Sequence, residues 1–158
     1  MRRFIAIALL AVAAPSLAHA EESVGAVALA VAALVAEQSP HLSAEEKALL
    51  AGYLDSRPAA PQNRIRGLRV EADRVRCRAG NVDIIAHSCE LTFGAATVRV
   101  EGRRAHELFA TLIELGVQSE GAAGSVFVGV SHLQCTIDTV EIADRAGAGA
   151  RCRFTPAS

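Results

Sequence analysis

The chain has 158 residues and a formal net charge of −1, and charged residues make up 21% of it. That balance excludes a globally basic nucleic-acid-binding protein and a polyacidic tail. With 51% hydrophobic residues, the chain can bury one core, and its length is that of a single domain.

The N-terminus has the pattern of a cleaved secretory signal. Two arginines precede an uninterrupted apolar run over 4–14, and the small residues Ala18 and Ala20 occupy the positions that a signal peptidase reads. The apolar run is shorter than the roughly 20 residues that a membrane-spanning helix needs. The sequence therefore predicts a signal peptide over residues 1–20 and an exported protein, periplasmic or secreted, that begins at Glu21 with a net charge of −3.

Two helices are predicted next. Residues 23–36 are rich in alanine and valine and carry no charge, which favours a helix buried on most sides over a helix at a membrane surface. Ser43 and Glu46 have the spacing of a capping box, so a second helix is predicted over 43–54. The short connection between the two helices predicts a helical hairpin over residues 21–56.

A proline-containing segment follows the hairpin. Residues 57–63 include Pro58 and Pro61, which fix φ and lack an amide donor. This segment is predicted to be a linker that leads into a domain over residues 64–158.

From residue 64 onward, apolar and polar residues alternate as they do in strands. The alternation changes phase near Asp73 and Arg74, which predicts a bulge or a bend between two short strands. Two further strands are predicted over 89–93 and 97–101, joined by a tight turn at Gly94.

The clearest helix is predicted over residues 103–115, where apolar residues recur at helical spacing and Gly116 lies at the expected end. After a glycine-rich loop at 121–125, the β-branched residues over 126–137 predict a strand. Two short elements follow, helical turns over 139–146 and a strand over 151–154.

The order of these elements indicates the fold class. Helices come first and strands then surround one central helix, without the repeated strand–helix units of a parallel sheet. The sequence therefore predicts an α+β fold, with an N-terminal helical hairpin followed by a small antiparallel sheet packed on one central helix and braced by two disulfides.

Four cysteines follow the predicted signal peptide. Exported proteins meet an oxidising environment, in which thiols pair. Each cysteine lies on the inward set of its predicted strand, and neighbouring antiparallel strands bring such side chains within disulfide reach. The predicted pairs, each of which brackets a local chain reversal, are Cys77–Cys89 and Cys135–Cys152.

Metal binding and thiol catalysis are the alternative interpretations of the cysteines. His87 lies two residues before Cys89, and His132 lies three residues before Cys135, spacings that suggest zinc ligands. A Cys-x-x-Cys motif, typical of structural zinc sites and dithiol redox sites, is absent from the sequence. We therefore predict disulfides, and neither a metal nor a cofactor.

Arg103, Arg104 and His106 lie at the start of the helix predicted over 103–115. They form either a solvated helix face or an anion-binding site, which the helix dipole would assist. His106 and Glu107 diverge by about 100° around the helix, so they are not predicted to act on one point together.

Arginine is concentrated between residues 57 and 78, a stretch that contains seven arginines and two acidic residues and so has a local net charge of +5. Residues 21–56 have a balance of −5. Either the acids of the hairpin face these arginines, or the arginines bind an anionic partner such as lipopolysaccharide, lipid headgroups or an acidic protein. No aromatic residues are interleaved, so nucleic acid is not a predicted partner.

No Walker motif and no nucleophile elbow occur in the sequence. We therefore predict a non-enzymatic binding or inhibitor-like module that contacts another envelope or extracellular protein. The alternatives are a small hydrolase-like envelope enzyme that uses His106, Glu107 or His132, and a protein associated with a membrane surface through residues 23–36. The preference for arginine over lysine is typical of a GC-rich bacterium.

Overall fold

The computed structural model describes residues 20–54, 67–80, 87–122, 124–142 and 145–157. Residues 1–19 of the predicted signal peptide and the whole predicted linker lie outside the described residues. The described residues form these elements: β1 (Glu21–Gly25), α1 (Ala26–Gln38), α2 (Ala44–Leu54), β2 (Arg69–Gly80), β3 (Ser88–Phe93), β4 (Ala96–Glu101), α3 (Arg103–Glu114), β5 (Ser119–Ala122), β6 (Ser125–Ile142) and β7 (Arg145–Pro156).

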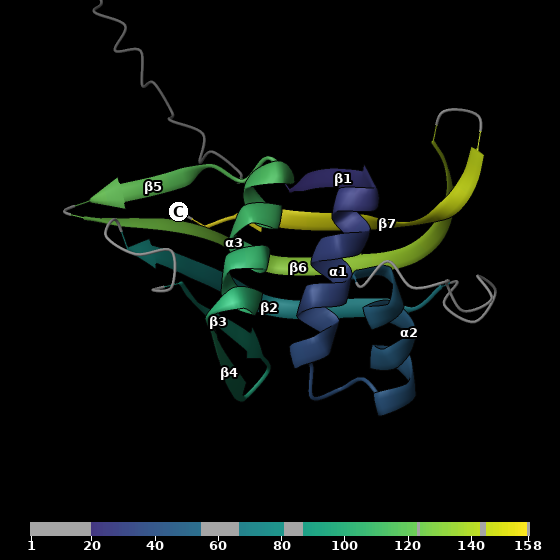
Figure 1. The fold of residues 1–158 in the computed structure, drawn as a ribbon, viewed down its shortest axis with the longest axis horizontal. Helices are drawn as coiled ribbons and strands as arrows, with labels where there is room; N and C mark the ends of the chain where they lie inside the picture. The colour runs from purple at the N-terminus through teal and green to yellow at the C-terminus, as the bar shows by residue number, and fades with distance from the viewer. Residues whose placement is uncertain (1–19, 55–66, 81–86, 123, 143–144, 158) are drawn as a thin grey trace, which may run out of the picture.

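The strands form one antiparallel sheet in the order β1-β7-β6-β2-β3-β4, and β5 pairs with β6. α1 and α3 lie side by side on one face of this sheet, and α2 packs on α1 (Figure 1). The predicted α+β class and antiparallel sheet are therefore confirmed. We call the face of the sheet that points away from the helices the open face.

The N-terminal segment differs from its prediction. A helix was expected from residue 23, but Glu21–Gly25 form a strand that pairs with β7, and the helix begins at Ala26. Gly25 adopts a φ of 121°, which side-chain-bearing residues rarely adopt, and so allows the change from strand to helix. The sequence of β1 lacks apolar alternation, so its strand conformation depends on the edge that β7 offers.

α1 is enclosed by protein rather than exposed to solvent. It contacts β7, α2 and α3, and its buried residues are Ala28, Leu29, Val31, Ala32, Ala33, Leu34, Val35 and Ala36. The single central helix is not confirmed, because α1 lies beside α3 as a second helix on the sheet. The helical hairpin over 21–56 is not confirmed either, because Glu21–Gly25 form a strand. None of the described helices combines the length and the apolar character needed to cross a bilayer.

α2 begins with the predicted capping box. The backbone N–H of Glu46 donates to Ser43 Oγ at 3.2 Å, and the backbone N–H of Ser43 donates to Glu46 Oε2 at 2.8 Å. Two amide groups that the helix itself leaves unpaired are thereby satisfied.

Replacement of Ser43 by alanine is expected to lower the free energy of unfolding by about 1 kcal/mol, because one capping acceptor is lost. Urea denaturation followed by circular dichroism measures this change. Ser119→Ala, at an exposed position of β5, is the matched control. Equal stability of the two variants would contradict the role of the cap.

α3 ends as predicted. The backbone N–H of Gly116, at φ 103°, donates to the carbonyl of Ile113, and that of Val117 donates to the carbonyl of Leu112. This pair of bonds is a Schellman motif, and Leu112 and Val117, at the two positions that usually form its apolar contact, are both buried.

The predicted change of phase in β2 occurs within one continuous strand rather than between two. Val70 and Ala72 are buried before it, and Val75 and Cys77 after it. The neighbouring β6 changes phase at the same level, where His132 has a φ of 58°. On both sides of this point, the residues of β2 that alternate with the buried ones therefore project from the open face.

The helical turns predicted over 139–146 are wrong, because the described residues of this stretch belong to β6 and β7. The register between the two strands runs as far as Ile142 opposite Arg145. Strand pairing in this long hairpin outweighs the local preference of its alanines for a helix.

Both predicted disulfides are present. Cys77 in β2 lies directly opposite Cys89 in β3, and Cys135 in β6 lies opposite Cys152 in β7, each pair with Cα atoms 4.0 Å apart. All four side chains are buried. Two such bonds are typical of an oxidising, extracellular-type environment.

Candidate functional site

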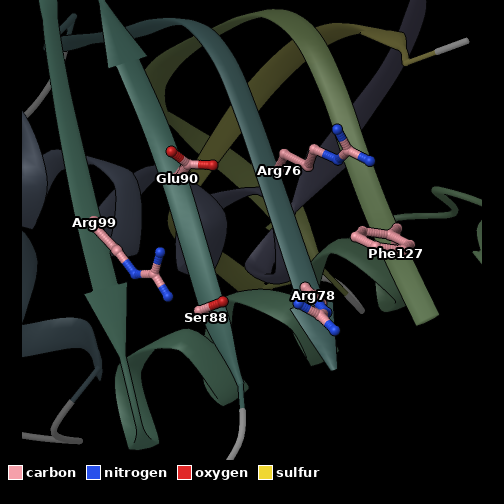
Figure 2. Close-up of a pocket in the computed structure, with 6 residues that line it drawn as sticks. All are labelled: Arg76, Arg78, Ser88, Glu90, Arg99 and Phe127. Atoms are coloured by element: carbon pink, nitrogen blue, oxygen red, sulfur yellow. The ribbon is translucent and has the colours of Figure 1, made fainter. Parts of the chain in front are cut away.

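The open face carries three arginines in a row along β2. Arg74, Arg76 and Arg78 alternate with the buried residues Val75 and Cys77, so all three project from the same face and are exposed. In Figure 2, Arg76 and Arg78 lie on this face with the helices behind the sheet. We call Arg74, Arg76 and Arg78 the arginine stripe.

Two arginines of the stripe contact an aromatic ring on the β6 side. The guanidinium carbons of Arg76 and Arg78 lie 4.7 and 5.9 Å from the ring centroid of Phe127. Arg78 also donates from Nε and Nη2 to Ser125 Oγ, at 3.2 and 2.9 Å. These contacts restrict the guanidinium groups without neutralising their charge.

The arginines of the stripe lack acidic partners, unlike most of the other described arginines. Within the described residues, no carboxylate forms an ion pair with Arg74, Arg76 or Arg78 at 4.0 Å or less. Arg69, at the other end of β2, is likewise without one. Ion pairs to carboxylates are made by Arg99, Arg103, Arg104, Arg151 and Arg153.

Two adjoining hollows flank the stripe. One of about 240 Å³ is lined by Arg76, Arg78, Ser88, Glu90, Arg99 and Phe127 (Figure 2). The other, of about 100 Å³, shares Arg76 and Phe127 and extends to Arg74 and Glu120. Glu90 lies opposite Arg76 in the register but forms no ion pair with it.

A larger hollow of about 430 Å³ lies farther along the open face, near β7, and is lined by Arg69, Arg151 and Arg153 among others. Two of these guanidinium groups are already occupied, because Arg151 and Arg153 both donate to Glu22. These hydrogen bonds lower the pKa of Glu22. The stripe is therefore the stronger candidate for binding an external anion, although its hollows are smaller.

The predicted anion site at the start of α3 is already partly neutralised. Glu107 accepts from Arg103 Nε at 2.9 Å and from Arg104 Nη1 at 2.7 Å, and Arg104 also pairs with Glu37 of α1. Burial opposes ionisation of Glu107, but the hydrogen bonds from Arg104 and Arg103 outweigh it and lower the pKa of Glu107. Anion binding by Arg103, Arg104 and His106 stays a prediction without further support.

His106 contacts a histidine that lies 19 residues before it in the sequence. His106 Nδ1 lies 3.4 Å from Nε2 of the buried His87, and the two rings meet edge to face. Phe109 packs against His87 from the same helix. The burial of His87 can be predicted from its position two residues before Cys89, which points into the core. Its contact with α3 depends on tertiary structure.

The remaining candidates stay apart from the stripe. Within the described part of the chain, no three side chains of His, Cys, Asp or Glu are grouped so as to hold a metal ion. His87 and Cys89 do not form a zinc site, since Cys89 is bonded to Cys77. The three hollows described above are not lined by His106, Glu107 or His132.

The interpretation that the acids of residues 21–56 face the arginines of β2 does not fit the described side chains. Glu37 pairs with Arg104 of α3, and Glu22 pairs with Arg151 and Arg153 of β7. The stripe instead lies across the sheet from the helices. Arg57, Arg64 and Arg66, also part of the predicted cluster, lie outside the described residues.

Comparison of the chain with protein family models, with curated proteins and with solved structures finds no match.

Proposed function

We propose that the protein is a non-enzymatic binding module, exported by a bacterium to the periplasm or the medium, that binds an anionic partner through the arginine stripe. The observation that carries this proposal is the contrast between the stripe and the paired arginines. Three like charges at successive outward positions of one strand repel each other, and none of the three forms an ion pair with a described carboxylate. A bound anionic partner would supply the missing counter-charge.

The scaffold supports this role. Cys77 lies between Arg76 and Arg78, points to the opposite face and is bonded to Cys89 of β3. The backbone that carries the stripe is therefore covalently fixed to the next strand. A rigid strand holds its side chains in position before the partner binds, and this lowers the entropic cost of binding.

The two alternative functions lack a specific observation in their favour. An enzyme that uses His106, Glu107 or His132 would need a concave site around them, and Glu107 is engaged by two arginines. Attachment to a membrane through residues 23–36 would need an exposed apolar helix, whereas the apolar residues of α1 are in the core.

Simultaneous replacement of Arg74, Arg76 and Arg78 by serine is expected to weaken binding to polyanions by about tenfold, since each exposed pair contributes roughly 0.2–1 kcal/mol. Dextran sulfate and poly-L-glutamate, titrated separately at low ionic strength, are suitable probes because they present anions on different backbones. Isothermal titration calorimetry measures the dissociation constants.

The matched control replaces Arg103, Arg151 and Arg153 by serine, which removes the same charge from arginines that already have partners. This control is expected to retain most of the affinity. If neither polyanion binds the native protein, or if both triple variants lose affinity equally, the proposal is wrong.

A further inference from the structure

We infer that the anionic partner is an extended polypeptide segment with an aspartate or glutamate at every second residue, which lies along β2 over the stripe. This inference rests on the proposed function and specifies its ligand. It is drawn from the spacing of the stripe, from the residues on either side of it and from the acids that border it.

The spacing of the stripe matches that of an extended peptide. Arg74, Arg76 and Arg78 are two residues apart on one strand, a separation of roughly 6.6 Å. An extended peptide presents alternate side chains on one face with the same repeat. Three alternate carboxylates can therefore meet the three guanidinium groups in register, and the planar guanidinium fork suits bidentate binding of each carboxylate.

The neighbouring strands leave room along this line. On the β6 side, the residues opposite the stripe are Phe127, Gly129 and Ser131, which carry no charge. Gly129 has no side chain opposite Arg76, and the smaller hollow lies at this position, bordered by the side chain of Ala157. On the β3 side, Ser88 and Thr92 are neutral and Glu90 is the one acid.

The acids around the stripe favour a linear partner over a surface of anions. Glu90 on β3 lies on one side of it, and Glu120 on β5 lies on the other. A membrane of anionic headgroups spreads its charge in two dimensions and would meet these carboxylates as well as the arginines. A narrow chain of carboxylates would meet chiefly the arginines.

Two capped heptapeptides of identical composition test the inference. One carries glutamate at its first, third and fifth positions, the other at its first, fourth and seventh, and serine fills all remaining positions. The native mature protein is titrated at about 0.01 M salt, where screening extends over roughly 30 Å. We expect the alternating peptide to bind at least about threefold more tightly, because its three carboxylates share one face.

Three single substitutions sharpen the result. Arg76→Ser is expected to abolish the preference for the alternating peptide, whereas Lys47→Ser, on α2, is expected to leave it unchanged. Glu90→Gln is expected to strengthen binding of the alternating peptide about twofold or more, because it removes the acid opposite Arg76. Thermal melts of all three variants establish that they are folded.

Equal affinity for the two peptides, or a preference that survives in Arg76→Ser, would overturn the inference. Tighter binding to phosphatidylglycerol vesicles than to either peptide would also overturn it. After any of these outcomes, the proposed function still holds if binding of an anionic partner depends on the stripe. If peptides, vesicles and polyanions all fail to bind, the proposed function itself fails.

Discussion

A fragment of residues 64–158 is expected to remain unfolded, although it contains six of the seven described strands, α3 and both disulfides. The reason is the position of α1, whose buried side chains cover the sheet next to α3. Leu29, Val31, Leu34 and Val35 alone contribute on the order of 8 kcal/mol of burial, at about 2 kcal/mol each. The whole free energy of unfolding of a domain is about 5–15 kcal/mol.

Thermal denaturation of the oxidised fragment, followed by circular dichroism, measures this directly, with the chain from Glu21 to Ser158 as the control. The fragment is expected to bind a hydrophobic dye and to lack a cooperative transition. A cooperative transition in the fragment would instead establish the boundary predicted between residues 21–56 and 64–158, and would mean that α1 is dispensable for the core.

Loss of the Cys135–Cys152 bond is expected to lower the free energy of unfolding by about 3 kcal/mol, because the unfolded chain regains the freedom of the closed loop. Replacement of both residues by alanine keeps small apolar side chains in the core. The melting temperature should fall by about 10 °C, given roughly 2–4 °C per kcal/mol in a chain of this size. Scanning calorimetry measures the shift.

The corresponding change at Cys77 and Cys89 is the matched comparison. That bond spans 12 residues rather than 17, so its removal is expected to cost slightly less. The variant without either bond should lose about 6 kcal/mol and be largely unfolded at 37 °C. A melting temperature that stays within about 2 °C of the native value after loss of one bond would show that the packing of the strands suffices without it.

The sequence predicted well those features that depend on neighbouring residues. The capping box at Ser43, the end of α3 at Gly116 and the inward position of each cysteine follow from short-range patterns, and all are present in the structure. The change of phase near Asp73 was also visible as a pattern. The side chain of Asp73, however, accepts a hydrogen bond from the backbone N–H of Gly94 in the turn after β3, and no local pattern predicts this contact.

The features that the sequence did not reveal depend on contacts between distant segments. Nothing in Glu21–Gly25 resembles a strand, and only the edge of β7 makes it one. The outward position of the stripe followed from alternation, but its lack of carboxylate partners did not. That property depends on which acids the fold places beside each arginine, and Glu22 and Glu37 pair with arginines of other elements.

The pairing of β1 with β7 also constrains the order in which the chain can fold. Glu22 and Arg153 contact each other across 131 residues of sequence. A chain exported as we propose, with its N-terminus first, therefore holds β1 and its neighbour α1 without their partner until almost all residues have emerged. Final closure of the sheet is thus expected to follow release of the whole chain, and such a long-range contact is expected to make folding slow.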